Sequence, residues 1–251
     1  MHEDQSSKKA IRTPKVAILL AAGMGIRQRP LTHHTPKPLL YARNRPLIDY
    51  TINALVYSGI KTIYVVTHYL ECQIVGYLEK YRKNNLDIIF CHQEAVNGTA
   101  GAVSAAKKHF KRIERRTDYL VISATDYVYP KGYIKELMDF HSERSNDISI
   151  SLRNIDPEMA EQSSSVVIDT DGHLVCIKEK PTSHGDDRIV AATLLYIVPV
   201  KIFDFLTSVN VSVRGEYELP DAINNMIKDG YRALGLKQSS MIEPESTPIS
   251  R

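Results

Sequence analysis

Residues 16–40 read VAILLAAGMGIRQRPLTHHTPKPLL, and this stretch decides the fold class. Its first five residues are apolar without a break, which is typical of a strand buried on both faces in a parallel sheet. Gly23 and Gly25 follow, and glycine lets the backbone turn tightly and present its N–H groups to an anion. Arg27 and Lys37 add positive charge to the same loop. A buried strand that opens into a glycine-rich, cationic loop predicts a binding site for a polyphosphate.

Strand-like and helix-like segments alternate along the first half of the chain. The expected strands are 16–20, 62–67, 87–91 and 119–124, and the expected helices are 46–58, 71–82 and 99–110. This alternation predicts an α/β fold, a doubly wound, Rossmann-like and mainly parallel sheet with helices on both faces. Ligands of such folds bind at the carboxyl ends of strands. We therefore expect the loops after Leu20, Cys91 and Ala124 to form the site.

The second half of the chain has a different pattern. Residues 170–172, Thr-Asp-Gly, separate two short β-like segments and predict a hairpin. The other expected elements are strands at 148–153 and 189–198 and helices near 201–206 and 219–228. Both ends of the sequence are polar and aperiodic. We therefore expect a flexible tail at 1–14, one domain at 15–236 and a polar C-terminal tail at 237–251.

The composition predicts a soluble protein without a nucleic-acid or membrane partner. The 251 residues include 32 Lys and Arg against 29 Asp and Glu, and the resulting net charge of +3 is too small to indicate a nucleic-acid-binding protein. The apolar run at 16–22 is far shorter than the roughly 20 residues that span a bilayer. Three cysteines without metal-ligand spacing indicate reduced thiols in a cytoplasmic protein.

Two common phosphate-binding motifs do not account for the loop. A Walker A loop requires Lys-Ser or Lys-Thr after its last glycine, and no such pair follows Gly25. A dinucleotide fingerprint requires a third glycine at position 28, where this chain has glutamine. The remaining alternative is an ordinary glycine-rich connection with surface cations. The ordered spacing of Arg27, Pro-Leu-Thr at 30–32 and Pro-Lys-Pro-Leu at 36–39 makes that alternative the weaker one.

The loop resembles the nucleotide loop of the sugar-1-phosphate nucleotidyltransferases, also called NDP-sugar pyrophosphorylases. Their pattern is L-A-A-G-x-G-[TS]-R-x-x-P-L-T followed by P-K-P-L, and the resemblance extends over roughly residues 15–235. It implies a fold of the nucleotide-diphospho-sugar transferase type with a small β-hairpin subregion on the sugar side. It also implies that a nucleoside triphosphate and a sugar 1-phosphate react to give an NDP-sugar and pyrophosphate, with Mg²⁺ as the cofactor. Because the sugar phosphate attacks the α-phosphorus in line, no protein nucleophile is expected.

The resemblance assigns roles to individual residues. Those expected to bind the nucleotide are Ala22, Gly23, Gly25, Gln93, Gly98 and Thr99. The expected catalytic residues are Arg27, Lys37 and Lys180, and those expected to contact the sugar phosphate are Glu179, Lys180 and Thr193. Asp126 is expected to hold the magnesium ion, because a hard oxygen at the end of a strand suits a triphosphate-bound Mg²⁺. A surface glutamine at position 93 and a loop or capping aspartate at position 126 are the structural alternatives.

The chain departs from the family pattern at four positions of the expected site. Ile26 stands where the family has Thr or Ser, and Thr125 replaces the glycine before the metal aspartate. Ala192 and Leu194 stand near positions where the family has Asn and Gly. These substitutions alter the surroundings of the phosphates, the nucleoside and the sugar.

A further departure concerns the second metal ligand. The family takes a second metal-binding aspartate from a W-x-D-x-G-T-P segment, but this chain has no tryptophan, and only Glu243 or Glu245 could substitute. Two hypotheses follow. The chain is either an active nucleotidyltransferase or a catalytically impaired relative that binds nucleotide or sugar phosphate and regulates or partners an active enzyme.

The motifs leave the choice of substrates open. The run G-T-A-G-A at 98–102 favours GTP and mannose 1-phosphate, whereas E-Y-E-L at 216–219 resembles thymidylyl- and uridylyltransferases. A cytidylyltransferase within the same fold is a third alternative. The segment GEYELPDA at 215–222 is expected mainly to shape the sugar side. A homo-oligomer is compatible with each of these alternatives, and the length is expected to suffice for the catalytic domain.

Overall fold

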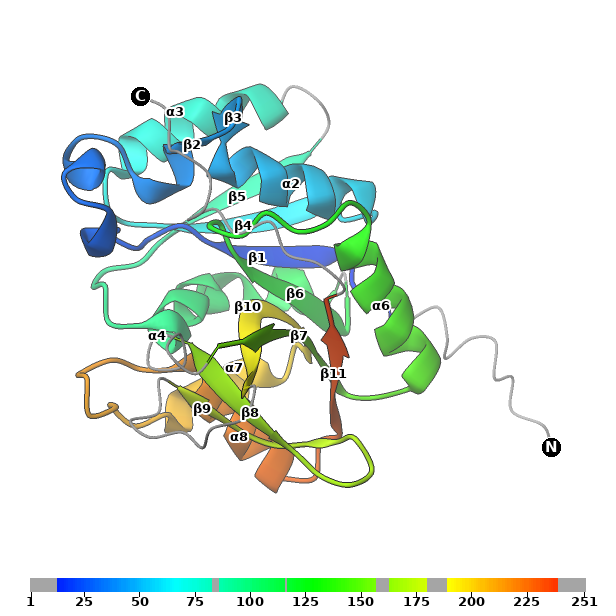
Figure 1. The fold of residues 1–251 in the computed structure, drawn as a ribbon. Helices are drawn as coiled ribbons and strands as arrows, with labels where there is room; N and C mark the ends of the chain where they lie inside the picture. The colour runs from blue at the N-terminus through cyan, green and yellow to red at the C-terminus, as the bar shows by residue number, and fades with distance from the viewer. Residues whose placement is uncertain (1–12, 83–85, 116, 157–162, 180–188, 239–251) are drawn as a thin grey trace.

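The structure, a computed structural model, describes residues 13–82, 86–115, 117–156, 163–179 and 189–238. Its central sheet has the strand order β11-β7-β10-β6-β1-β4-β5 (Figure 1). The bounds are β1 (Val16–Leu20), β4 (Thr62–Thr67), β5 (Asp87–His92), β6 (Tyr119–Ala124), β7 (Ile148–Ile155), β10 (Ile189–Pro199) and β11 (Ala233–Lys237). Strands β1, β4, β5 and β6 run parallel, and β11 is parallel to β7, whereas β10 is antiparallel to both of its neighbours. The predicted mainly parallel sheet is confirmed.

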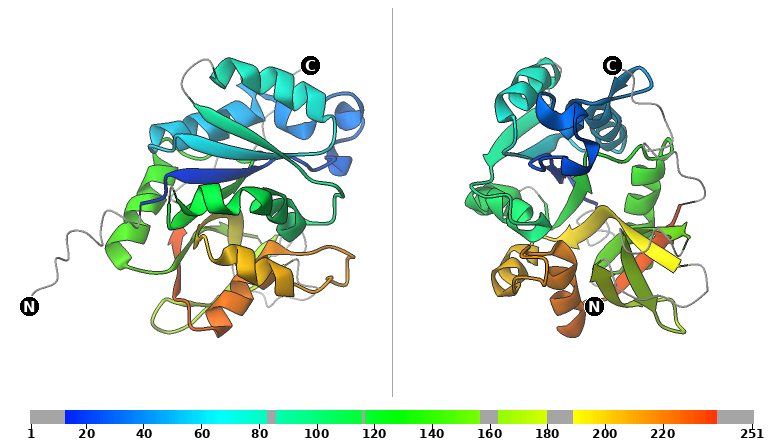
Figure 2. Two further views of the ribbon diagram at one scale, coloured as in Figure 1. Left: turned by 180° about the vertical axis from the view of Figure 1, so that it is seen from behind. Right: turned by 60° about the vertical axis from the view of Figure 1, so that its left-hand side comes forward.

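Helices cover both faces of the sheet (Figures 1 and 2). One face carries α2 (Leu47–Tyr57), α3 (Glu71–Arg82) and α6 (Tyr133–Arg144), and the other carries α4 (Thr99–Ser104), α5 (Phe110–Glu114), α7 (Ile202–Phe205) and α8 (Leu219–Lys228). Because side chains alternate along a strand, Val16 and Ile18 of β1 pack in one core while Ala17 and Leu19 pack in the other. None of the helices in the described ranges is long and apolar enough to cross a membrane.

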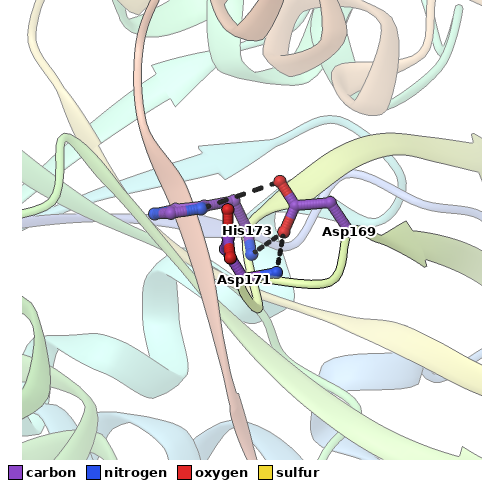
Figure 3. A group of neighbouring side chains, drawn as sticks. All are labelled: Asp169, Asp171 and His173. Carbon is purple, nitrogen blue, oxygen red and sulfur yellow. Dashed lines mark hydrogen bonds and ion pairs between the residues drawn. The ribbon is translucent and has the colours of Figure 1, made fainter.

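A hairpin extends the antiparallel side of the sheet. Its strands are β8 (Ser164–Ile168) and β9 (Leu174–Glu179), and β8 also pairs with β10. At the turn, Oδ1 of Asp169 accepts hydrogen bonds from the backbone N–H groups of Asp171 and His173, at 2.9 and 2.8 Å (Figure 3). The hairpin predicted around residues 170–172 is therefore present.

Three short helical turns shape the segment after β1. They are Ile26–Gln28, Leu31–His33 and Lys37–Leu39, and each has the 3-10 geometry. The small strands β2 (Tyr41–Ala42) and β3 (Arg45–Pro46) then lead directly into α2. The glycine-rich loop is thus part of a folded segment, which fixes where its cations lie.

The structure corrects several boundaries. The helix expected at 99–110 is divided into α4, a 3-10 turn at Ala105–His109 and α5, while α6 and β11 were not expected. Pro14 is buried and so belongs to the domain rather than to the tail expected at 1–14. At the other end β11 includes Lys237, and the N–H of Gln238 donates to the Leu152 carbonyl oxygen at 2.9 Å. The domain therefore includes Lys237 and Gln238 of the tail expected at 237–251, and residues 1–12 and 239–251 lie outside the described residues.

Candidate active site

Three loops meet at the edge of the sheet where β1, β5 and β6 end. Together they line a cleft of about 430 Å³. The residues predicted to bind nucleotide that line this cleft are Ala22, Gly23, Gly25, Gln93, Gly98 and Thr99. Arg27, Lys37 and Asp126 line it as well. The structure thus brings the predicted phosphate loop, the segment from Gln93 to Thr99 and the predicted metal ligand into one cavity.

The glycine-rich loop has a fixed shape. Gly25 has a φ of +61°, and a Cβ there would lie 2.8 Å from Cγ2 of Thr32. The Thr32 hydroxyl donates to the carbonyl oxygen of Gly25, and the Tyr69 hydroxyl donates to that of Thr32, each at 2.8 Å. Position 25 therefore requires glycine on conformational and steric grounds. At Gly23, in contrast, a Cβ would meet no atom within 4 Å, so this part of the loop borders open space.

Lys37 and Asp126 join two of the loops. Lys37 lies between two prolines, which restrict its backbone. Its Nζ is 2.7 Å from Oδ2 of Asp126, and the two side chains are 22% and 32% exposed. The other carboxylate oxygen, Oδ1 of Asp126, is buried and has no hydrogen-bond partner among the described residues.

The unpartnered oxygen of Asp126 suits a cation. A buried polar atom without a partner costs free energy unless a ligand or ion satisfies it. Mg²⁺ prefers hard oxygen ligands such as carboxylate and phosphate groups. Within the described part of the chain, the carboxylates that line the cleft are those of Asp126 and Glu216. These carboxylate oxygens therefore fit a magnesium ion whose other ligands are oxygens of a bound triphosphate.

The start of α4 is held in place by a distant segment. The N–H of Tyr217 donates to the carbonyl oxygen of Asn97 at 2.7 Å, and the N–H of Ala100 donates to the carbonyl oxygen of Tyr217 at 2.9 Å. Gly98 has a φ of +107°, and a Cβ there would lie 2.4 Å from the Tyr217 carbonyl oxygen. Only glycine allows this close approach. The two segments therefore form one rigid wall of the cleft.

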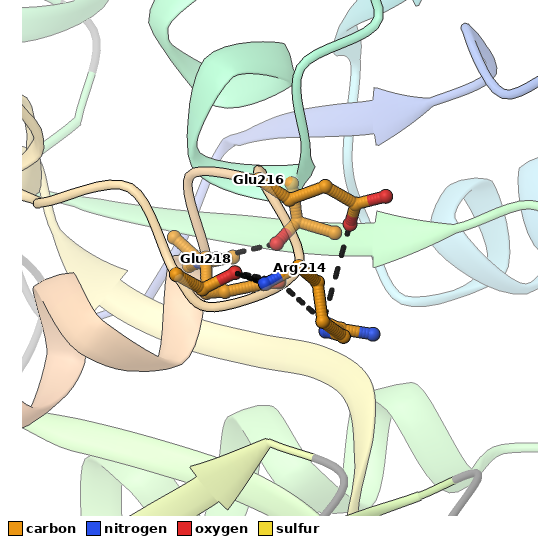
Figure 4. A network of polar contacts seen from close by, with 6 residues as sticks. Arg214, Glu216 and Glu218 are labelled. Carbon is orange, nitrogen blue, oxygen red and sulfur yellow. Dashed lines mark hydrogen bonds and ion pairs between the residues drawn. The ribbon is translucent and has the colours of Figure 1, made fainter.

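The loop before α8 continues this wall (Figure 4). Arg214 forms an ion pair with the buried Glu218, and its guanidinium lies 3.9 Å from Oε2 of Glu216. Glu216 is exposed and lines the cleft. The N–H of Leu219 donates to Oγ1 of Thr99 at 2.8 Å, so the hydroxyl of Thr99 also has a structural contact.

Three of the four departures from the family pattern lie in the cleft. Ile26 is 56% exposed and lines it together with Leu194. Thr125 lines it too, and its hydroxyl donates to the carbonyl oxygen of Leu20 at 3.4 Å. Ala192 is buried in the core instead. Ile26 gives the cleft apolar surface where the family pattern has Thr or Ser. Leu194 does the same near a position where the family has Gly.

The structure does not place Thr193 at the cleft, although it was predicted to contact the sugar phosphate. Its side chain is fully buried, and its hydroxyl donates to Oγ of Ser151 at 2.7 Å. Successive side chains of a strand face opposite sides, so the neighbouring Leu194 lines the cleft. The hydroxyl of Thr193 stabilises the pairing of β10 with β7.

Other predicted site residues cannot be located in this way. Lys180, Glu243, Glu245 and the side chain of Glu179 lie outside the described residues. Their contacts with the sugar phosphate or with a second metal ion stay predictions.

The sequence reasoning missed the contribution of Glu216 to the cleft. Residues 215–222 were assigned mainly to the sugar side, because they resemble a family segment with that role. The pairing of Tyr217 with Asn97 brings this segment next to the start of α4. No local pattern in the sequence indicates this pairing, which only the structure shows.

The comparisons with known proteins agree with this arrangement. The family model described as nucleotidyl transferase matches residues 16–241, and the chain therefore belongs to that family. It is 30% identical over 217 residues to the bifunctional protein GlmU of Methanococcus aeolicus, a match that covers 85% of this chain and 47% of the relative. It is 32% identical over 213 residues to a bifunctional sugar-1-phosphate nucleotidylyltransferase/acetyltransferase of Sulfurisphaera tokodaii, covering 85% and 48%.

A third curated relative is the mannose-1-phosphate guanyltransferase of Pichia angusta, with 29% identity over 204 residues and coverage of 79% and 53%. The chain spans about half the length of these relatives.

Solved structures show the same fold. A UDP-glucose pyrophosphorylase complexed with UDP-glucose superposes with a TM-score of 0.77 at 18% identity, covering 90% of this chain and 92% of the other. A putative glucose-1-phosphate thymidylyltransferase from Bacillus anthracis gives a TM-score of 0.75 at 23% identity, covering 89% and 86%. The Rossmann-like α/β architecture predicted from the sequence is therefore confirmed.

Proposed function

We propose that this chain is a nucleotidyltransferase that joins a nucleoside triphosphate to a sugar 1-phosphate, giving an NDP-sugar and pyrophosphate. The observation that carries the proposal is the Lys37–Asp126 pair. It puts a cation and a carboxylate with one unpartnered oxygen into the same cleft as the glycine-rich loop. A triphosphate requires both positive charge and a metal ligand of this kind. Membership of the nucleotidyl transferase family supports the same class of reaction.

In this proposal the residues of the chain position the reactants rather than react with them. Backbone N–H groups of the loop around Gly23 and the side chains of Arg27 and Lys37 bind the triphosphate oxygens. An oxygen of the sugar phosphate forms the new bond to the α-phosphorus, and the bond from the α-phosphorus to the β-phosphate oxygen breaks. Pyrophosphate leaves with the electron pair of the broken bond on its oxygen. Positioning and charge neutralisation are sufficient for this step, so no protein nucleophile is needed.

The proposed cofactor is Mg²⁺, with Asp126 as its ligand from the described part of the chain. When bound, the ion would neutralise charge on the triphosphate and polarise the α-phosphate. Lys37 holds the second oxygen of the same carboxylate. It therefore orients Asp126 before nucleotide arrives and can transfer its N–H groups to a phosphate oxygen afterwards.

The names of the relatives support the reaction class rather than one pair of substrates. They include a mannose-1-phosphate guanyltransferase, a UDP-glucose pyrophosphorylase and a putative glucose-1-phosphate thymidylyltransferase. The bases and sugars in these names differ. We therefore propose a nucleoside triphosphate and a hexose 1-phosphate as the substrate classes.

The test is an assay of pyrophosphate release. The purified chain is incubated with each of the common nucleoside triphosphates and a panel of hexose 1-phosphates, with Mg²⁺ or with EDTA. We expect release that requires nucleotide, sugar phosphate and Mg²⁺ together. Nucleotide binding without release from any pair would contradict the proposal and would favour the impaired, regulatory relative.

A further inference from the structure

The loop that carries Lys37 is shaped largely by short-range contacts. The backbone N–H groups of Gln28, His33 and Leu39 each donate to the carbonyl oxygen three residues earlier, at 2.9, 3.0 and 2.8 Å. Such contacts form the three 3-10 turns, but they do not attach the loop to the rest of the domain. The position of Lys37 therefore also depends on contacts with other segments.

The turn between β4 and α3 supplies such contacts. The hydroxyl of Tyr69 lies 2.8 Å from the carbonyl oxygen of Thr32 and 3.1 Å from that of His33, and it donates to this pair of neighbouring acceptors. Nε2 of Gln73, in the first turn of α3, donates to the carbonyl oxygen of His34 at 2.9 Å. Two side chains from one turn thus hold three consecutive carbonyl groups of the loop.

This turn is itself anchored. Glu71, the first residue of α3, accepts a hydrogen bond from the Thr67 hydroxyl at 2.6 Å, and its other carboxylate oxygen lies 2.7 Å from Nδ1 of His92 on β5. Leu70 has a φ of +48°, a left-handed conformation that a leucine adopts only where its surroundings impose it. Tyr69 therefore projects from a turn of fixed shape.

Thr32 links the Tyr69 contact to the cleft. Its hydroxyl donates to the carbonyl oxygen of Gly25 at 2.8 Å. A Cβ at Gly25 would lie 2.8 Å from Cγ2 of Thr32 and 3.1 Å from Cβ of Lys37, so both side chains pack against the same glycine. A shift of the Thr32 backbone would therefore move Lys37, whose Nζ contacts Asp126.

Tyr69 acts from outside the space where a ligand would bind. As far as the structure describes the cleft, Tyr69, Thr32 and Gln73 are not among the residues that line it. Tyr69 is half-buried, whereas Gln73 is exposed. The hydrogen bonds of Tyr69 are therefore better shielded from water, and they are the stronger of the two holds on the loop.

We propose that Tyr69 is a positioning residue for the nucleotidyl transfer: its hydroxyl holds the loop between Gly25 and Lys37 so that Nζ of Lys37 stays at the reacting phosphates. Gln73 adds a weaker hold. This inference rests on the proposed function, since it takes Lys37 to contact the triphosphate. A charged group that is in place before the substrates arrive does not have to be ordered during the reaction.

The experiment is a double-mutant cycle on pyrophosphate release. Tyr69→Phe removes one oxygen atom and keeps the ring. With the nucleoside triphosphate and hexose 1-phosphate that the wild type uses best, we expect kcat/KM to fall about tenfold, in the range that one lost hydrogen bond produces. In the Lys37→Met background the same substitution should lower kcat/KM by no more than about threefold, because the group that Tyr69 positions is gone. A merely structural role of Tyr69 would give the same factor in both backgrounds.

Tyr133→Phe is the matched control. The Tyr133 hydroxyl also lies between two acceptors, the carbonyl oxygen of Leu236 at 2.8 Å and Oγ of Ser151 at 3.1 Å, but at the opposite edge of the sheet. Its kcat/KM should stay within about twofold of the wild-type value. Gln73→Leu serves as a second variant if Tyr69→Phe does not fold, as judged by its melting curve. It should lower kcat/KM about threefold, and this effect should disappear in the Lys37→Met background.

Hydrogen exchange tests the hold on the loop without any substrate. In ligand-free Tyr69→Phe, the backbone amides of residues 25–40 should exchange several-fold faster than in the wild type, because the loop opens more often. In Tyr133→Phe their exchange should match that of the wild type.

An unchanged kcat/KM in Tyr69→Phe would contradict the inference. So would an equal fall in both backgrounds, or unchanged exchange of the loop amides. If the wild type releases no pyrophosphate, the proposed function fails and this inference with it. If the wild type and Tyr69→Phe release pyrophosphate equally well, the proposed function stands and only the role of Tyr69 is wrong.

Discussion

Nζ of Lys37 and Oδ2 of Asp126 lie 2.7 Å apart, although the two residues are 89 positions apart in the sequence. The contact joins the loop after β1 to the end of β6. Because Oδ1 of Asp126 has no partner in the described structure, the carboxylate is oriented but not saturated. The charges that a triphosphate and its cation require are thus assembled in the fold itself.

Replacing Lys37 by methionine should remove the charge and keep most of the side-chain volume. We expect kcat/KM for pyrophosphate formation to fall by roughly 100-fold, because one charged group that contacts the reacting phosphates is lost. The melting temperature should change little, since a partly exposed ion pair contributes little stability. Lys135→Met is the control, because Lys135 forms an exposed ion pair with Asp139 on α6. Near-normal kcat/KM in Lys37→Met would exclude a role of Lys37 at the phosphates.

Gly98→Ala should damage the wall of the cleft. The new Cβ would lie 2.4 Å from the Tyr217 carbonyl oxygen at a φ of +107°, so the segment around Tyr217 must move. We expect the free energy of unfolding to fall by roughly 1–3 kcal/mol, together with weaker nucleotide binding. Gly76→Ala in α3 is the control, because a Cβ there meets nothing within 4 Å. That variant should gain roughly 0.5–1 kcal/mol in urea unfolding. Equal stabilities of the two variants would show that the wall is not rigid.

Arg214→Met should leave the buried carboxylate of Glu218 without its ion pair. The Ser212 hydroxyl, which donates to Glu218 at 3.3 Å, compensates only in part. A buried carboxylate is costly without its cation, but the partial exposure of Arg214 limits this cost. We therefore expect a loss of roughly 1–3 kcal/mol in the free energy of unfolding. The double variant Arg214→Met with Glu218→Gln should recover part of this loss in chemical denaturation. A double variant less stable than Arg214→Met alone would contradict the account of the pair.

The cysteines should differ in reactivity. Burial raises the pKa of the Cys91 thiol to about 11, from an ordinary value of 9.0, whereas Cys72 is exposed. At pH 8 iodoacetamide should therefore modify Cys72 in the native protein and reach Cys91 only after unfolding, as mass spectrometry of the peptides can show. Rapid native modification of Cys91 would contradict its position in the core.

The same pKa predicts a dependence of stability on pH. The unfolded thiol of Cys91 ionises near pH 9, but the folded thiol keeps its proton up to about pH 11. The stabilising contribution is therefore complete below pH 9 and is lost as the pH rises from about 9 to about 11. The urea midpoint of the wild type should fall faster over this interval than that of Cys91→Ala. Parallel pH profiles would contradict the raised pKa.

Local patterns were sufficient to predict most of the fold. Strand β4 at Thr62–Thr67 and helix α3 at Glu71–Arg82 have the predicted bounds, because continuous apolar runs and helical spacing are local signals. Helix α6 was missed although Ile134, Leu137 and Met138 have helical spacing and are buried. Strand β11 contains glycine and only three apolar residues, and it is defined by its pairing with β7, a contact that no local pattern shows.

The candidate site, too, could be predicted from the sequence only in part. The glycine loop and Asp126 follow strands directly, so their positions could be derived from the alternation of strands and helices. Thr193 lies in the core with its hydroxyl on Ser151, and the family resemblance alone does not fix which face of β10 a residue occupies. The contribution of Glu216 to the cleft depends on a contact between segments more than 100 residues apart, the pairing of Tyr217 with Asn97, and the sequence alone did not predict it.

The measurement that tests the central proposal most directly is pyrophosphate release by Asp126→Asn beside the wild type. Asp139→Asn, which alters an exposed carboxylate on α6, is the matched control. We expect the wild type and the control to release pyrophosphate from a nucleoside triphosphate and a sugar 1-phosphate in the presence of Mg²⁺. Asp126→Asn should be slower by roughly 100-fold or more while its melting temperature stays close to that of the wild type. Wild-type release by a folded Asp126→Asn variant would contradict the assignment of Asp126 and with it the proposed reaction centre.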